Sequence, residues 1–107
     1  MTDHCLVYVT ASSHEEAMKI GRSVVAARAA ACANVLGPIA SIYWWQGKLE
    51  EGGEVALLLK TRTALVERVV AMVRAEHSSV CPCVVAMPIN AGNPAFLNWI
   101  ETETTIP

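Results

Sequence analysis

The 107 residues suffice for one domain, expected to span residues 1–107, and at 53% hydrophobic and 17% charged residues the chain is more apolar than an average soluble domain. The net charge of −2, without any cluster of Lys and Arg, argues against a nucleic-acid partner. No apolar run approaches the roughly eighteen residues of a membrane span, and no signal-peptide pattern opens the chain. We therefore expect no membrane partner and a cytoplasmic location.

The first third of the chain predicts a strand followed by a helix. Residues 5–10, CLVYVT, form a nearly continuous apolar run that is typical of a buried strand. Ser12 and Ser13 are each followed three residues later by a glutamate, which is a capping-box signature. The helix that they open has an apolar side and an alanine-rich end, and is expected to run to about Ala33.

Residues 39–60 predict a long β-hairpin. The first arm, IASIYWW, is rich in β-branched and aromatic residues, and Gln46-Gly47 is a plausible two-residue turn. A turn or bulge is expected at Gly37-Pro38 and a second bulge or bend at Gly52-Gly53. Both faces of the returning arm are apolar, so both are expected to be covered. This pattern favours a sheet shared between subunits; a hairpin that serves only as core is the alternative.

A second helix and another strand follow the hairpin. Thr63 is a reasonable N-cap, and the helix carries an apolar stripe that ends at His77 instead of pointing this side chain to water. Residues 81–87 are expected to form the next strand, which would open with the thiols of Cys81 and Cys83.

The last expected helix completes a recognisable order of elements. Asn93 caps it with Pro94 at its first position, and it should bury Phe96, Trp99 and Ile100. Residues 102–107 would add an edge strand or fray. The order β-α-β-β-α-β, then a short helix, predicts an α+β fold of the ferredoxin-like, split β-α-β type, an antiparallel sheet with helices on one face.

Five short segments occur in the order and spacing of a known family. They are TASS at 10–13, AACAN at 30–34, SIYWWQGKLEE at 41–51, LKT at 59–61 and LNWI at 97–100. In these motifs, which together cover nearly the whole chain, the sequence resembles the CutA divalent-cation tolerance proteins. The resemblance implies a ferredoxin-like subunit in a tight homotrimer, with strands pairing between subunits and an architecture similar to the PII-type nitrogen regulators. It also implies a link to copper and other divalent metals.

One segment departs from the family pattern. The family usually reads His-Pro-Tyr-x-x-Pro-Glu where this chain reads HSSVCPC at residues 77–83. Ser79 stands at the tyrosine position and Cys83 at the glutamate position. Whatever polar pocket the family builds from that tyrosine and glutamate is therefore altered here.

The expected functional locus is a cleft at the subunit boundary. No Gly-rich phosphate loop, nucleophile elbow or HExxH motif is present, so we expect no enzyme. The candidate cleft residues are the polar or amphipathic groups on apolar elements: Tyr43, Trp45, Lys60, Thr61 and His77. Lys60 ends an apolar strand and needs a partner, which is either Glu51 or Glu54 of a neighbouring subunit or a bound anion.

The candidate metal ligands are thiols and an imidazole, which suit Cu(I) and zinc. The set is Cys32, His77, Cys81 and Cys83. In an extended chain Cys81 and Cys83 emerge on one face, and His77 could swing towards them from its helix end. The competing interpretation makes Cys32 a core residue and Cys83 a filler of an apolar gap.

The sequence thus predicts a trimeric cytosolic protein that binds or responds to copper or another divalent metal, without an organic cofactor. The alternative is a PII-like sensor or interaction module that binds a small anionic ligand between subunits. Cys5 is expected in the core, and His4 and His14 at the surface.

Overall fold

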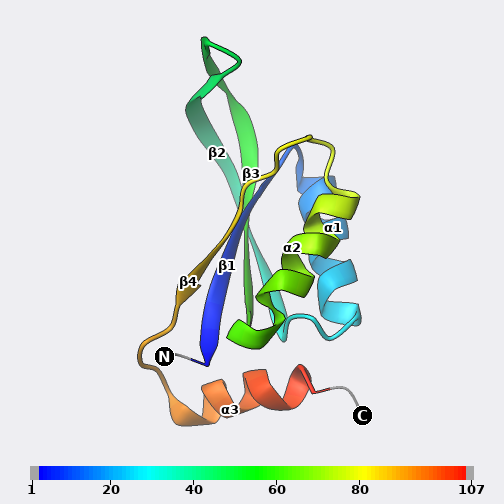
Figure 1. Cartoon of the computed structure of the whole chain (residues 1–107), viewed down its shortest axis with the longest axis vertical. Coiled ribbons are helices and arrows are strands. Elements are labelled where there is room, and N and C mark those ends of the chain that lie inside the picture. Colours follow the sequence, from blue (N-terminus) through cyan, green and yellow to red (C-terminus); the bar gives the residue numbers. More distant parts are fainter. Residues whose placement is uncertain (1–2, 106–107) are drawn as a thin grey trace.

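A computed structural model describes residues 3–105 as a four-stranded antiparallel sheet with two helices on one face and a third helix across one end (Figure 1). The elements are β1 (His4–Ala11), α1 (His14–Ala26), β2 (Cys32–Trp45), β3 (Lys48–Arg62), α2 (Val66–Glu76), β4 (Val84–Pro88) and α3 (Pro94–Glu103). The strand order is β2-β3-β1-β4. The predicted α+β class and the ferredoxin-like order of elements are confirmed.

The core lies between the central strands and helices α1 and α2. Alternate side chains of β1 and β3 are fully buried, among them Val7, Val9, Leu57 and Leu59. Gly21 lets α1 approach the sheet, because an added Cβ would lie 3.1 Å from the Cβ of Ala33. The close approach of α1 to the sheet therefore depends on a residue without a side chain at position 21.

The first helix ends at Ala26 and not near Ala33, so this prediction was wrong. Arg28 adopts a positive φ of 58°, the N–H of Ala29 donates to the Val24 carbonyl at 3.0 Å, and the N–H of Arg28 donates to Val25 at 2.9 Å. This is a Schellman-type cap, with arginine where glycine is usual. The alanines that suggested a longer helix instead lead into β2, which starts at Cys32.

Strands β2 and β3 form a hairpin that projects beyond the helices (Figure 1). Gln46 and Gly47 have φ values of 50° and 79°, as a two-residue type I′ turn requires. The predicted bulge at Gly37 is confirmed by a register shift beside it and a φ of 114°. At Gly52 and Gly53 the ladder continues without a shift, so the second bulge was wrongly predicted.

Two boundaries in the second half also differ from the prediction. A 3₁₀ turn, Thr63–Leu65, precedes α2, and the N-cap residue of that helix, Leu65, makes no side-chain cap bond. Strand β4 begins at Val84, so Cys81 and Cys83 lie in the loop before it. Pro82 separates the two cysteines and has no N–H for a ladder, which favours loop over strand there.

Helix α3 closes the end of the sheet opposite the hairpin tip (Figure 1). Its predicted start is confirmed, because the Asn93 side chain accepts a hydrogen bond from the N–H of Ala95 at 3.1 Å. Of the three side chains expected to be buried, Ile100 is buried, whereas Phe96 and Trp99 are 40% and 39% exposed. The two rings contact each other, with their centroids 5.4 Å apart. Residues 106 and 107 of the predicted tail lie outside the described residues.

His4, which was expected at the surface, is instead held under α3. Its side chain is only 13% exposed and its Nε2 lies 3.4 Å from a carboxylate oxygen of Glu101. His14 is exposed and Cys5 is buried, as predicted. Among residues 3–105, no helix combines the length and apolar character that a membrane span requires.

Candidate functional site

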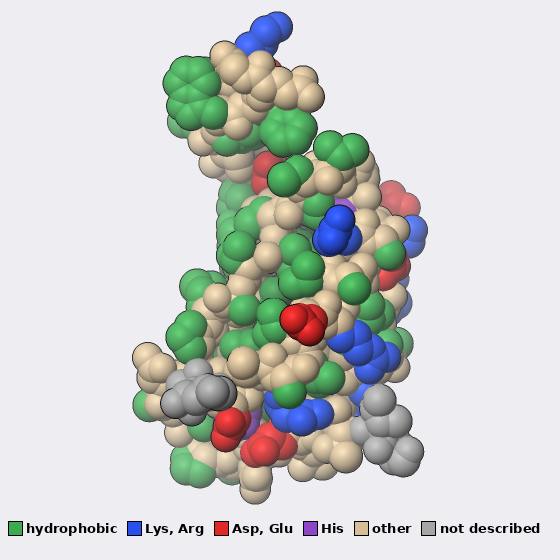
Figure 2. All heavy atoms as spheres, in the orientation of Figure 1, with side chains coloured by type: hydrophobic (Ala, Val, Ile, Leu, Met, Phe, Trp, Pro, Cys, Tyr) green, Lys and Arg blue, Asp and Glu red, His purple; other side chains and the backbone are tan. Residues whose placement is uncertain are grey.

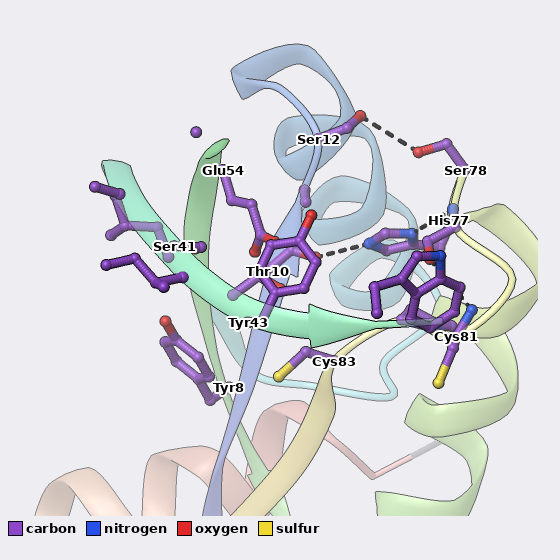
Figure 3. A pocket seen from close by; sticks show the side chains of 18 residues that line it. Tyr8, Thr10, Ser12, Ser41, Tyr43, Glu54, His77, Ser78, Cys81 and Cys83 are labelled. Atoms are coloured by element: carbon purple, nitrogen blue, oxygen red, sulfur yellow. Dashed lines mark hydrogen bonds between the residues drawn. The ribbon is translucent and has the colours of Figure 1, made fainter. Parts of the chain in front are cut away.

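A cavity of about 770 Å³ lies where one face of the hairpin meets the end of β1 and the loop between α2 and β4 (Figure 3). Its volume falls within the range of roughly 300–1,000 Å³ that is usual for small-molecule sites. The hairpin supplies residues 39–43 and Trp45 of β2, together with Gly53 and Glu54 of β3. The aromatic, acidic and thiol side chains that line it include Tyr8, Tyr43, Trp45, Glu54, Cys81 and Cys83.

The cavity brings together some of the predicted site residues and leaves out others. Tyr43, Trp45, His77, Cys81 and Cys83 all line it. The remaining three predicted residues, Lys60, Thr61 and Cys32, do not.

The three residues outside the cavity have other surroundings. Thr61 is buried and its hydroxyl donates to the Ala29 carbonyl at 2.6 Å, which ties β3 to the segment after α1. Lys60 lies with its Nζ 5.5 Å from the ring centroid of Phe96. Cys32 pairs with Lys60 across the β2–β3 ladder, and burial raises the pKa of its thiol although the nearby ammonium partly lowers it.

His77 is tightly held at the edge of the cavity. The N–H of Ser79 donates to Nδ1 at 2.9 Å, so Nδ1 is unprotonated, and Nε2 lies 2.7 Å from the Thr10 carbonyl, to which it donates. The side chain is only 6% exposed. Both ring nitrogens are therefore engaged, and these contacts hold the loop to β1.

Glu16 completes the same contact from α1. One carboxylate oxygen accepts the N–H of Ser12 at 2.9 Å, the other accepts the N–H of Ser78 at 3.1 Å, and the first lies 3.6 Å from Nε2 of His77. Burial alone would raise the pKa of Glu16, but these hydrogen bonds and His77 together bring that pKa below its ordinary value. The predicted capping residue therefore also anchors the loop that carries the cysteines.

The two loop cysteines are free thiols, with Cys81 exposed and Cys83 partly buried. Figure 3 shows the sulfur of Cys83 directed towards Tyr8 and that of Cys81 directed away from it. Between residues 3 and 105, no three or more His, Cys, Asp and Glu side chains are arranged to hold a metal ion. The four predicted ligands are thus not gathered into one preformed site.

Among the cavity residues that were not predicted, Tyr8 and Glu54 bear most on its chemistry. Tyr8 alternates with the buried Val7 and Val9, so the period-two pattern of β1 could have placed it on the opposite face. Glu54 was considered only as a partner for Lys60 of another subunit. In the structure its carboxylate points towards the space beside Thr10 and Tyr43 (Figure 3).

A second feature is an exposed apolar surface, here called the apolar flank. Figure 2 shows apolar side chains gathered at the hairpin tip and along the visible side of the sheet. The flank comprises Ile42, Trp44, Leu49, Val85 and Met87, which are 69%, 73%, 57%, 52% and 43% exposed. Three of these residues lie on the hairpin arm and two on the edge strand β4. Groups of exposed apolar side chains commonly mark interaction sites.

Comparisons with known proteins agree with the fold. The family of the CutA1 divalent ion tolerance protein matches residues 5–103. A relative from Archaeoglobus fulgidus, the divalent-cation tolerance protein CutA, is 42% identical over 98 residues, which cover 92% of this chain and 95% of that protein. The mouse protein CutA is 40% identical over 91% of this chain, which spans about half (55%) of the mouse sequence.

The structural comparison gives the same result. The solved structure of the A. fulgidus CutA, described as a periplasmic divalent cation tolerance protein, superposes with a TM-score of 0.92 at 40% identity. The match covers 95% of this chain and 99% of that one. The chain therefore belongs to the CutA1 divalent ion tolerance family.

Proposed function

We propose that this chain is a metal-tolerance protein that binds copper or another thiophilic metal ion through Cys81 and Cys83, and that it acts without catalysing a reaction. The family name supports the general class. The observation that carries the site is the pair of free thiols, one exposed and one partly buried, on a loop that lines the cavity. Thiolates are the protein ligands that favour Cu(I) and zinc.

The structure changes the roles expected for the other two candidates. His77 is proposed to position the thiol loop and not to bind metal, because both of its ring nitrogens already have partners. Cys32 is proposed to be structural, because a thiol with a raised pKa forms the metal-binding thiolate less readily. Further ligands would come from loop rearrangement or from thiols of other subunits.

A Cu(I) titration against a competing chelator, under anaerobic reducing conditions, tests this proposal. The parent protein and Cys32→Ser should bind with equal affinity, whereas Cys81→Ser/Cys83→Ser should lose binding. A His77→Gln variant should weaken binding without abolishing it, since the thiols remain. Equal binding by the parent and the double cysteine variant would overturn the thiol site.

A homotrimer is part of the same proposal. Neighbouring subunits would cover the apolar flank, and exposed apolar side chains of this kind commonly mark interaction sites. Large hydrophobic interfaces couple folding to assembly, so the trimer should persist at low micromolar concentration. Light scattering that detected a stable 11.5 kDa monomer would contradict this part.

We also propose a cytosolic location, where free thiols stay reduced. The solved A. fulgidus relative is described as periplasmic and a rice relative as chloroplastic, so the compartment differs among the names of related proteins. Cell fractionation combined with thiol trapping tests the location. Protein recovered outside the cytosol would contradict it.

A further inference from the structure

The cavity carries negative charge from a carboxylate that has no partner of its own. Glu54 takes part in no hydrogen bond or ion pair within residues 3–105. The described residues that line the cavity include no lysine or arginine, and Lys60 lies against Phe96 instead. Both ring nitrogens of His77 are engaged, by the Ser79 N–H and the Thr10 carbonyl. The charge of the cavity therefore favours a cation and opposes the anionic ligand that the sequence suggested.

The walls beside this carboxylate are aromatic. Tyr8 comes from β1, and Tyr43 and Trp45 come from the same face of β2. Figure 3 shows Tyr8, Tyr43 and Glu54 around one open space. Ring faces attract cations electrostatically, and cages of aromatic side chains are a known way to bind quaternary ammonium groups.

We propose that this cavity binds a small organic cation of the ammonium class. The aromatic rings would surround the alkylated nitrogen, and the Glu54 carboxylate would balance its charge. A hard divalent ion is a poorer occupant, because calcium takes 6–8 oxygen ligands and a single lining carboxylate supplies at most two. This site uses different groups from the thiol site and goes beyond the proposed metal function.

The test compares choline with its neutral isostere, in which a tert-butyl group replaces the trimethylammonium group. Both are titrated by NMR and calorimetry into the full chain in its native assembly, metal-free and reduced. Choline should bind about tenfold more tightly than the neutral alcohol, because only the cation gains from the rings and the carboxylate. Its N-methyl proton signal should move upfield under the aromatic ring currents.

Matched variants assign the binding to the named residues. Glu54→Gln should weaken choline binding about fivefold to tenfold, and Glu50→Gln, which removes the same charge from the same strand outside the cavity, should not. Tyr43→Leu should weaken it by a similar factor, whereas Tyr43→Phe, which keeps the ring, should not. Circular dichroism and light scattering show whether each variant keeps its fold and assembly.

The thiol variant separates this proposal from the metal proposal. Cys81→Ser/Cys83→Ser should bind choline as the parent does, whether or not the parent binds copper. Equal binding of choline and the neutral alcohol would overturn the inference. So would choline binding that Glu54→Gln and Tyr43→Leu leave unchanged, or binding of inorganic phosphate in place of choline.

Discussion

The body of the molecule buries large apolar side chains, whereas the hairpin arm exposes side chains of the same kind. The body packs α1 and α2 on β1 and β3, and the Val and Leu side chains on that face are fully buried. The arm, residues 39–54 of the same two long strands, exposes Ile42, Trp44 and Leu49. The chain is 44 Å along its longest axis and about half that across, so the arm extends past any helix that could cover it.

This difference shows where the folding of one chain is complete and where it is not. The body buries its apolar surface with elements of the same chain. The arm has complete backbone pairing in its hairpin, but its Ile42, Trp44 and Leu49 side chains remain exposed. Substitutions in the two regions should therefore change different measurements.

The largest effect is expected from Trp45→Ala in the arm. We propose that Trp45 packs against a neighbouring subunit, so its truncation should loosen the assembly by roughly 3–5 kcal/mol. Sedimentation over a dilution series measures this change. An unchanged melting temperature, with a water-like tryptophan emission in the parent, would show that the arm is not an interface.

Leu57→Ala tests the body. Leu57 is fully buried beneath α1, and its loss should lower the free energy of unfolding by about 2–5 kcal/mol through lost burial and a cavity. Leu49→Ala, at a position that is 57% exposed in the single chain, is the matched control and should cost less. Urea titrations at one protein concentration compare them, and equal losses would remove the distinction between body and arm.

Glu16→Gln tests the junction between the two regions. The variant loses the charge that strengthens two backbone hydrogen bonds, from Ser12 and Ser78, and should lose about 1–2 kcal/mol of stability. Glu15→Gln removes the same charge from the first turn of α1 at an exposed position and serves as control. Hydrogen exchange at the Ser78 amide should become faster in Glu16→Gln and not in Glu15→Gln. The same exchange rate in both variants would contradict the proposed role of Glu16 in holding the loop.

The smallest expected effect is in the pH dependence of stability. The pKa of Glu16 is lower in the folded chain than its ordinary value of 4.5. Its contribution is therefore fully present above pH 4.5 and is lost as the pH falls through the folded pKa. As the pH falls below 4.5, the parent should lose stability more steeply than Glu16→Gln; parallel curves would contradict this assignment.

Local patterns predicted much of the fold correctly. The Ser13 cap, the Gln46-Gly47 turn and the Asn93-Pro94 helix start are confirmed because each depends on neighbours within a few residues. The order of strands and helices followed from the same local signals. The motifs identified the family, but the resemblance did not specify which residues form a binding site.

The errors occurred where distant segments compete with local preference. The alanines at 29–31 favour a helix, but the N–H of Ala31 donates to the Lys60 carbonyl and the Ala29 carbonyl accepts from Thr61, which draws the segment into the sheet. The sequence around Cys81 and Cys83 resembles the start of a strand. In the structure this segment is a loop, which is held by the contact of His77 with the Thr10 carbonyl and by the hydrogen bond from the Ser78 N–H to Glu16.

The sequence by itself determined the element types, their order, the two apolar faces of β3 and the family. Only the tertiary structure decided which polar groups meet. It placed Lys60 against Phe96, engaged both nitrogens of His77, and directed the Glu54 carboxylate into a cavity with Tyr8 and Tyr43. The physical reason is that periodicity assigns a side chain to a face of its own element, whereas strand twist and helix packing decide which other faces it meets.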